Sequence, residues 1–313
     1  MLKKIKLLLL LFILSLFLLN SCSIKKEKIF KESFAFNTFY SIIAYDYDNK
    51  ENAIKTLNNT IKMINDYELL FSKTNKDSEL YKINHLELDL ENASEELKNL
   101  INISFLYKEQ TSNAFDITIG SLIDLWDINN RKTLPSNKDI ENSRNIIQYD
   151  LGGIAKGYVS EKIKEYLIEN NIYSCIINFG GNVVCIGSKE NNQDFIIGIK
   201  MPFDESKIID TIKVKNQSVV TAGIYERYFK IDGDDKIYHH IIDPSTSYPV
   251  DNNLYSVTIC MDNAMIADVL STTCIIKGLE ESNSFLNNFS KKNNINIIAI
   301  FIDKKLNIIK EEY

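Results

Sequence analysis

The chain has 313 residues, and its 36 Lys and Arg residues against 42 Asp and Glu residues give a formal net charge of −6 at pH 7. Without the three lysines of the N-terminal segment, 33 basic residues remain and the net charge is about −9. No basic stripe is present to neutralise a phosphate backbone, so the composition excludes a nucleic-acid partner. The rest of the chain is long enough for one large or two modest domains.

The first 21 residues are predicted to be a lipoprotein signal peptide. Lysines precede an apolar run from Leu7 to Leu14, and the sequence Leu-Asn-Ser-Cys ends at Cys22. This run is short for a membrane-spanning helix, and a small residue before a cysteine is typical of bacterial lipoprotein cleavage sites. We expect a lipid on Cys22, a charged tether over residues 22–33, and a location at a cell membrane, outside the cytoplasm. An uncleaved N-terminal anchor helix would give the same location.

The rest of the chain mixes helical and strand patterns. Residues 34–47 are aromatic and β-branched, which predicts a strand, whereas apolar residues recur at helical spacing in 50–70. Further helices are predicted over 93–110, 158–170 and 263–276. Further strands are predicted over 173–188, 194–202, 208–223, 226–244, 254–261 and 295–303. This order indicates one α+β domain over 34–313 with mixed, largely antiparallel sheets, not a doubly wound parallel sheet.

Four cysteines follow Cys22, all in apolar strand-like or helical segments. They are Cys175, Cys185, Cys260 and Cys274. No C-x-x-C spacing is present, which disfavours a zinc site. We expect buried thiols, and the sequence alone does not reveal whether any two form a disulfide.

Glycine is concentrated in one part of the chain, since seven of the 11 glycines lie between Gly152 and Gly198. The stretch DLGGIAKGY (150–158) is not a Walker A loop, because that motif has four residues between its glycines and a hydroxyl residue after its lysine. Gly152 and Gly153 come just before a predicted helix, where backbone amides can face an anion. A tight turn before the helix explains these glycines equally well.

Near the C-terminus, Asp268, Ser271 and Thr272 have the spacing i, i+3, i+4, which would put three side-chain oxygens on one helix face. Such a set suits Mg²⁺, which prefers oxygen ligands and keeps part of its shell for phosphate and water. An exposed helix face with two incidental hydroxyls is the alternative.

Two of the three histidines are neighbours, His239 and His240, in a strand-like run that ends at a proline-containing turn. Successive residues of a strand face opposite ways, so at most one of them points to a given site. That histidine would be a proton acceptor, and the other a structural or surface group. His85, in a polar region, is predicted to be a surface residue.

Seven ordered blocks of sequence resemble the ApbE family of FAD:protein FMN transferases. They are SKTNKDSELYKIN, AFDITIGSLIDLW, DLGGIAKGY, NFGGN with Gly187, SVVTAGIYERYF, YHHIIDP and ADVLSTT. The resemblance spans nearly all of the chain after the tether, and it implies a domain of two subdomains with a flavin site between them. It also implies Mg²⁺-dependent cleavage of FAD and transfer of FMN to a threonine, with release of AMP. The acceptor would be an exported or membrane protein, such as an electron-transport subunit, with a Ser/Thr-rich motif.

The resemblance also assigns residues. The metal would be bound by the carbonyl of Gly153 with Asp268 and Thr272, and by the adjacent Ser271. His240 would be the base that activates the acceptor threonine. The family's flavin contacts fall on Phe36, Thr74, Ala114, Phe115, Asp116, Asp150, Lys156 and Ile242.

Some positions depart from the family pattern. Asn113 and Ser247 stand where the family usually has glycine, Ala222 replaces a serine, and Ser121 replaces a common proline. None is a proposed metal ligand, so these departures do not exclude activity, and Asn113 and Ala222 are the ones expected to affect flavin affinity. Two other functions share the motifs: a Mg²⁺-dependent pyrophosphatase that releases FMN and AMP, and a lipoprotein that binds FAD without cleaving it. Asp268, Thr272 and His240 disfavour the second, because storage needs neither a cation nor a base.

Overall fold

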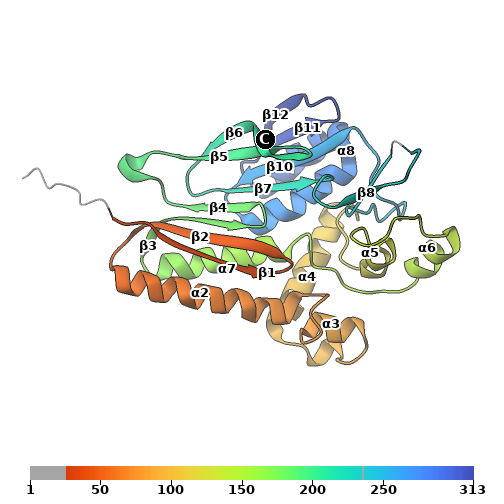
Figure 1. Cartoon of the computed structure of the whole chain (residues 1–313), viewed down its shortest axis with the longest axis horizontal. Coiled ribbons are helices and arrows are strands. Elements are labelled where there is room, and N and C mark those ends of the chain that lie inside the picture. Colours follow the sequence, from red (N-terminus) through yellow and green to blue (C-terminus); the bar gives the residue numbers. More distant parts are fainter. Residues whose placement is uncertain (1–25, 235) are drawn as a thin grey trace, which may run out of the picture.

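A computed structural model describes residues 26–234 and 236–313, and an eight-stranded antiparallel sheet forms its centre (Figure 1). The strand order is β1-β2-β3-β4-β7-β10-β11-β12. Their bounds are β1 Ile29–Ala35, β2 Thr38–Tyr47, β3 Ile172–Phe179, β4 Asn182–Ile186, β7 Ser218–Gly223, β10 Leu254–Met261, β11 Ile298–Asp303 and β12 Ile308–Glu312. Two antiparallel hairpins lie beside this sheet: β5 (Phe195–Met201) with β6 (Asp204–Val214), and β8 (Tyr228–Lys230) with β9 (Ile237–His239).

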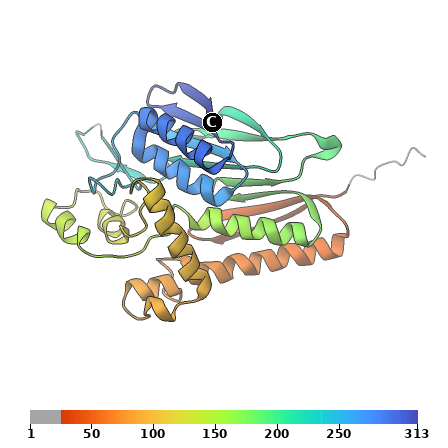
Figure 2. The ribbon, with the colours of Figure 1, turned by 180° about the vertical axis from the view of Figure 1, so that it is seen from behind.

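Helices cover one face of the central sheet, as the reverse view shows (Figure 2). The helices are α2 Lys50–Phe71, α3 Glu79–Asn84, α4 Glu95–Gln110, α5 Gly120–Trp126, α6 Asn137–Arg144, α7 Ala155–Glu169 and α8 Ala264–Asn293, with single 3₁₀ turns at Leu90–Asn92 and Glu190–Asn192. Of these, α2, α7 and α8 pack against the sheet, whereas α5 and α6 lie beside it (Figure 1). This arrangement confirms the predicted α+β class.

The helix-covered face of the continuous sheet carries two apolar cores, and a third cluster lies between the sheet and the β5–β6 hairpin. The first lies between β1–β4 and the helices α2, α4 and α7, and includes Leu57, Leu97 and Val159. The second lies between β7, β10, β11 and α8, and includes Val257 and Leu270. The two halves of the molecule are therefore joined by sheet hydrogen bonds and not by a linker.

The predicted strand over 34–47 is a hairpin, and the predicted tether is shorter than residues 22–33. Residues 29–35 form β1, which pairs with β2 from Ile29 opposite Ala44 to Ala35 opposite Thr38. In β1 the polar run Lys31-Glu32-Ser33 separates Phe30 from Phe34, which concealed the strand pattern. Phe36 and Asn37 both have positive φ, as the two central residues of a type I′ hairpin turn require.

The bounds of α2, α4 and α7 lie close to the predicted ranges, whereas no helix was predicted over α3 and the C-terminal helix is longer than expected. The helix expected to end near residue 276 continues as α8 to Asn293, with a kink at Gly278, where φ is 73°. Beyond this kink Leu286 and Phe289 are buried, so packing against the second core sustains the extra turns.

The predicted signal peptide and Cys22 lie outside the described residues. Within residues 26–234 and 236–313, no helix has the length and apolar character needed to span a bilayer. The four other cysteines, Cys175, Cys185, Cys260 and Cys274, are buried free thiols, as expected.

Candidate functional site

A cavity of about 1090 Å³ opens at the end of the central sheet where the two halves meet. Among the described residues, every predicted site residue except Ser271 lines it. Those residues are Phe36, Thr74, Ala114, Phe115, Asp116, Asp150, Gly153, Lys156, His240, Ile242, Asp268 and Thr272. Segments far apart in the sequence thus form one site.

The glycine-rich stretch begins as a turn and continues as α7. The Oδ1 atom of Asp150 accepts a hydrogen bond from the amide of Gly152 at 2.7 Å. Ile154 is the N-cap of α7 and has no side chain able to accept from the free amides of the first turn. Asp268 from α8 supplies that acceptor, since its Oδ2 lies 2.9 Å from the amide nitrogen of Gly157. The carboxylate is therefore fixed against a helix N-terminus, which favours negative charge.

Gly157 makes this contact between the two helices feasible. A Cβ atom at this position would lie 2.5 Å from the carbonyl oxygen of Ala264 and 2.7 Å from Cα of Met265. The helices therefore cross too closely for any side chain here, and the crossing brings Asp268 beside the start of α7.

Oxygen donors that suit a hard cation lie beside Asp268. A Cβ atom built on Gly153 would lie 3.6 Å from the Oγ1 atom of Thr272, so the predicted carbonyl, hydroxyl and carboxylate donors share one region. Asp268 is only 4% exposed, and its Oδ1 lies 3.9 Å from Nζ of Lys156. In the described part of the chain no three His, Cys, Asp or Glu side chains converge. A cation here would use one carboxylate with neutral oxygens, which fits Mg²⁺.

Ser271 is the exception among the predicted metal ligands. Its hydroxyl donates to the main-chain oxygen of Asp268 at 2.9 Å, and the residue is 1% exposed without lining the cavity. A serine hydroxyl can donate a hydrogen bond to a main-chain carbonyl in the preceding turn of its own helix, so the i, i+3, i+4 spacing alone did not determine the direction of this hydroxyl. The structure therefore groups Asp268 and Thr272 without Ser271.

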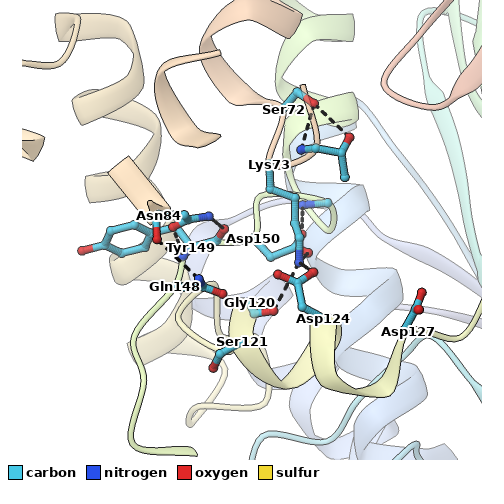
Figure 3. Close-up of polar contacts among 12 residues, drawn as sticks. Ser72, Lys73, Asn84, Gly120, Ser121, Asp124, Asp127, Gln148, Tyr149 and Asp150 are labelled. Atoms are coloured by element: carbon cyan, nitrogen blue, oxygen red, sulfur yellow. Dashed lines mark hydrogen bonds and ion pairs between the residues drawn. The ribbon is translucent and has the colours of Figure 1, made fainter. Parts of the chain in front are cut away.

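Lys73 is a cavity residue that the sequence analysis did not identify. Its Nζ lies 2.7 Å from Oδ1 of Asp124 and 3.1 Å from Oδ2 of Asp150, and donates to the carbonyl of Gly120 at 3.2 Å (Figure 3). Burial lowers the pKa of Lys73, but the two carboxylates outweigh this effect and raise it above the ordinary value. Burial likewise raises the pKa of Asp150, yet Lys73 and the Gly152 amide hold it below the ordinary value.

The segment before Asp150 is held by the helix α3. Asn84 accepts a hydrogen bond from the amide of Tyr149 at 2.7 Å and donates to its carbonyl at 2.8 Å (Figure 3). Asp150 itself donates its amide to the carbonyl of Ile117 at 2.8 Å. The polar block SKTNKDSELYKIN, whose second half forms α3, therefore fixes Asp150 from two sides through Lys73 and Asn84.

The paired histidines face opposite ways, as predicted. His239 is 1% exposed; its Nε2 donates to the carbonyl of Val250 at 2.8 Å, and burial lowers its pKa to about 4. His240 lines the cavity, and its Nδ1 lies 3.3 Å from the carbonyl oxygen of Arg227. A carbonyl only accepts, so this contact puts the proton on Nδ1 and leaves Nε2 free to accept one. Burial and then the Arg227 charge hold the pKa of His240 well below 6.5.

His85 is an exposed residue stacked on Tyr81, with ring centroids 3.8 Å apart, as expected for a surface group. It does not line the cavity.

The run Ala114-Phe115-Asp116 is fixed by the end of α4. The amide of Phe115 donates to Oγ1 of Thr111 at 3.1 Å, and Oδ2 of Asp116 lies 2.7 Å from Nζ of Lys108. The Oδ1 atom of Asp116 accepts from both the amide and the hydroxyl of Thr118. These contacts occupy both carboxylate oxygens and hold the run rigidly at the cavity wall.

Two hairpin turns form the end of the cavity near Phe36. The amide of Phe36 donates to Oε1 of Glu68 at 2.9 Å, and the side-chain amide of Asn37 donates to Thr74 at 3.1 Å. Gly180 in the turn between β3 and β4 has φ 60°, and a Cβ atom there would lie 2.6 Å from the Thr38 hydroxyl. Glycine therefore lets this second turn approach the first.

The departures from the family pattern have local explanations. Asn113 and Ser247 have φ of 64° and 68°, a region where glycine is unstrained, asparagine is tolerated and serine is less favoured. The hydroxyl of Ser121 lies 2.7 Å from the carbonyl oxygens of Ser143 and Ile146, which a proline could not bind. Ala222 lines the cavity without a polar group.

Comparisons with known proteins agree with this geometry. The model of the ApbE family matches residues 36–299. The chain is similar to the FAD:protein FMN transferase of Klebsiella pneumoniae strain 342, with 32% identity over 79% of this chain and 82% of that protein. It is also similar to the FAD:protein FMN transferase of Treponema pallidum, with 29% identity over 66% of each chain.

Solved structures of the same kind share the fold. The crystal structure of the ApbE protein from Thermotoga maritima has a TM-score of 0.79 and 28% identity, over 91% of this chain and 97% of that one. The flavin transferase ApbE from Vibrio cholerae has a TM-score of 0.73 and 21% identity, over 92% of this chain and 96% of that one. At that identity the second likeness concerns the fold alone.

Proposed function

Because the chain belongs to the ApbE family, we propose that it is a FAD:protein FMN transferase that cleaves the pyrophosphate of FAD and releases AMP. FMN is joined to a threonine hydroxyl of an acceptor protein. The observation that carries this proposal is the convergence of Gly153, Asp268, Thr272 and His240, from distant parts of the chain, on one cavity.

Gly153, Asp268 and Thr272 would hold Mg²⁺. A cation would reduce the repulsion between the buried Asp268 and a pyrophosphate placed beside it. When bound, Mg²⁺ offsets the charge that develops as the phosphoanhydride breaks. The N-terminus of α7 and Lys156 add positive potential on the same side, so this chain's own groups favour an anion there.

His240 takes the proton of the acceptor threonine. A protonated hydroxyl is a poor nucleophile, and a neutral imidazole is an effective base for it. The lowered pKa of His240 keeps the ring neutral at neutral pH, and its Nδ1 contact with the Arg227 carbonyl orients the free Nε2. The acceptor proposed here is an exported or membrane redox protein with a Ser/Thr-rich motif.

We further propose that the protein acts outside the cytoplasm, anchored to a membrane by lipid on Cys22. The support is the sequence of the first 22 residues, in which an apolar run follows lysines and leads to a cysteine. Labelling with a lipid precursor would test this, with Cys22→Ser as the control that should lose the label.

The function is tested by incubating the protein from Ser23 onward with FAD and Mg²⁺, with and without an acceptor that carries such a threonine. AMP release and the intact mass of the acceptor are followed together. A Mg²⁺-dependent mass gain equal to FMN supports the transferase. AMP and free FMN without labelled acceptor would instead identify a pyrophosphatase, and bound intact FAD without AMP would identify a storage protein.

A further inference from the structure

Asn182, the first residue of β4, is buried at the cavity with an unused hydrogen-bond donor. It is 2% exposed, and its Nδ2 has no hydrogen-bond partner. Five other buried side-chain atoms in the described part of the chain also lack a partner, and none of them belongs to a residue that lines the cavity. A buried amide left without a partner costs roughly 1–3 kcal/mol, so a group that remains unpaired here is suited to a ligand.

Strand geometry places Asn182 on the helix-covered face of the sheet. Side chains alternate along β4, so Asn182 shares the face of Val184, which packs in the first core with Ala155 and Val159 of α7. Both α7 and α8 contact β4. Asn182 and the first turn of α7 also line the same cavity, so the amide and the helix N-terminus face one ligand-binding space.

The surroundings indicate which ligand atom this amide would bind. The N-terminus of α7 and Lys156 both favour negative charge, and a carboxamide NH₂ group donates hydrogen bonds. An anionic oxygen is the partner that each of these groups favours, whereas an apolar ring edge would leave the amide unpaired. In a dinucleotide such as FAD, the anionic oxygens are those of the pyrophosphate.

We propose that Asn182 is a substrate-binding residue whose Nδ2 donates to a pyrophosphate oxygen of FAD. This inference rests on the proposed function and adds to it a ligand contact on the sheet side of the site. It also accounts for an unpaired buried amide that contributes nothing to the stability of the protein without ligand.

Two opposite effects of one substitution test the proposal. Asn182→Leu keeps the branching and the number of heavy atoms of the side chain and removes the unpaired amide, so the Tm of the ligand-free protein should stay the same or rise. Its Kd for FAD should rise about ten- to a hundredfold, as expected for loss of a hydrogen bond to a charged group. If Asn182 had only a structural role, the substitution would lower Tm and would leave the relative affinities for the ligands unchanged.

The binding experiment uses FAD, ADP and riboflavin with EDTA present, so that FAD is not cleaved. Asn182→Leu should weaken FAD and ADP binding but not that of riboflavin, which has no phosphate. The matched control is Asn130→Leu, because Asn130 lines the same cavity but its amide donates to Asp127 at 2.8 Å. This control should change each Kd by less than about threefold.

The outcomes separate the two proposals. Unchanged FAD binding by Asn182→Leu, or an equal loss for riboflavin, would overturn the role of Asn182 and leave the proposed function intact. Failure of the unaltered protein to bind FAD, both with EDTA and with Mg²⁺, would overturn both.

Discussion

The polar groups in one wall of the cavity are paired with one another, whereas those in a second wall are left partly unpaired. In the paired wall, formed by Lys73, Asp124 and Asp150, the lysine is held by two carboxylates and a carbonyl. In the open wall, formed by Asn182, His240 and Asp268, each side chain keeps one polar atom without a hydrogen bond to the described residues. Satisfied groups rigidify a site, whereas unsatisfied groups near a cavity favour a ligand. The chemistry is therefore expected at the open wall, and shape and positioning at the paired wall.

The largest effect is expected at Asp268. Asp268→Asn keeps an acceptor for the Gly157 amide but loses the charge needed for a cation, so Mg²⁺-dependent AMP release should fall by about 10³-fold or more. Its Tm should stay near that of the unaltered protein, whereas Asp268→Ala should also lose about 1 kcal/mol of stability with the helix cap. Unchanged AMP release by Asp268→Asn would remove the metal assignment.

Substitution of His240 should lower the rate of FMN transfer more than the rate of FAD hydrolysis. His240→Gln is expected to lower FMN transfer to the acceptor by about 10²-fold, with a smaller loss of AMP release to water, because only the threonine needs this base. Acceptor mass and AMP are measured in the same samples. Equal losses in both would argue against the assigned role.

The pH profile of transfer tests the same residue independently. A lowered pKa means that His240 stays neutral as the pH falls through 6.5, so the transfer rate should be maintained there and decline only at lower pH. The measurement is the transfer rate from pH 4.5 to 8 at saturating FAD and Mg²⁺. An apparent pKa at or above 6.5 for loss of transfer contradicts the prediction.

Substitutions in the paired wall should mainly lower the free energy of unfolding. Lys73→Met leaves the largely buried Asp150 without its cation, which should cost about 2–3 kcal/mol in the free energy of unfolding by urea. The double variant with Asp150→Asn should lose less than the sum of the single losses, since both remove one interaction. Lys73→Arg keeps the cation and is the control. Additive losses would mean that the pair does not act as a unit.

The smallest effect is expected away from the cavity. Ser247 has φ 68° and a buried hydroxyl without a partner, yet it does not line the cavity. Ser247→Gly should therefore stabilise the protein by about 1 kcal/mol without weakening FAD binding, in contrast to Asn182→Leu. Asn113→Gly should increase stability by less, because asparagine already tolerates a positive φ. Thermal unfolding with and without FAD measures both, and a weakened FAD Kd in Ser247→Gly would undermine the distinction.

Sequence periodicity predicted α2, α4 and α7 well, because long amphipathic repeats reflect burial against one core. The motif blocks contain most of the cavity lining, but not the part formed by the β1–β2 and β5–β6 hairpins. Lys73 and Asn182 were missed because their importance depends on neighbours far along the chain, such as Asp150, and on an absent partner. Ser271 was placed wrongly, because helical spacing fixes where a side chain starts and not where its hydroxyl points.

The most direct test of the two-wall account is a crystal structure of the protein with FAD, grown without divalent cations. The account predicts the pyrophosphate within hydrogen-bonding distance of Asn182, beside the N-terminus of α7, with the Lys73–Asp150 ion pair intact. A pyrophosphate bound to Lys73 in place of Asp150, with Asn182 still unpaired, would contradict it.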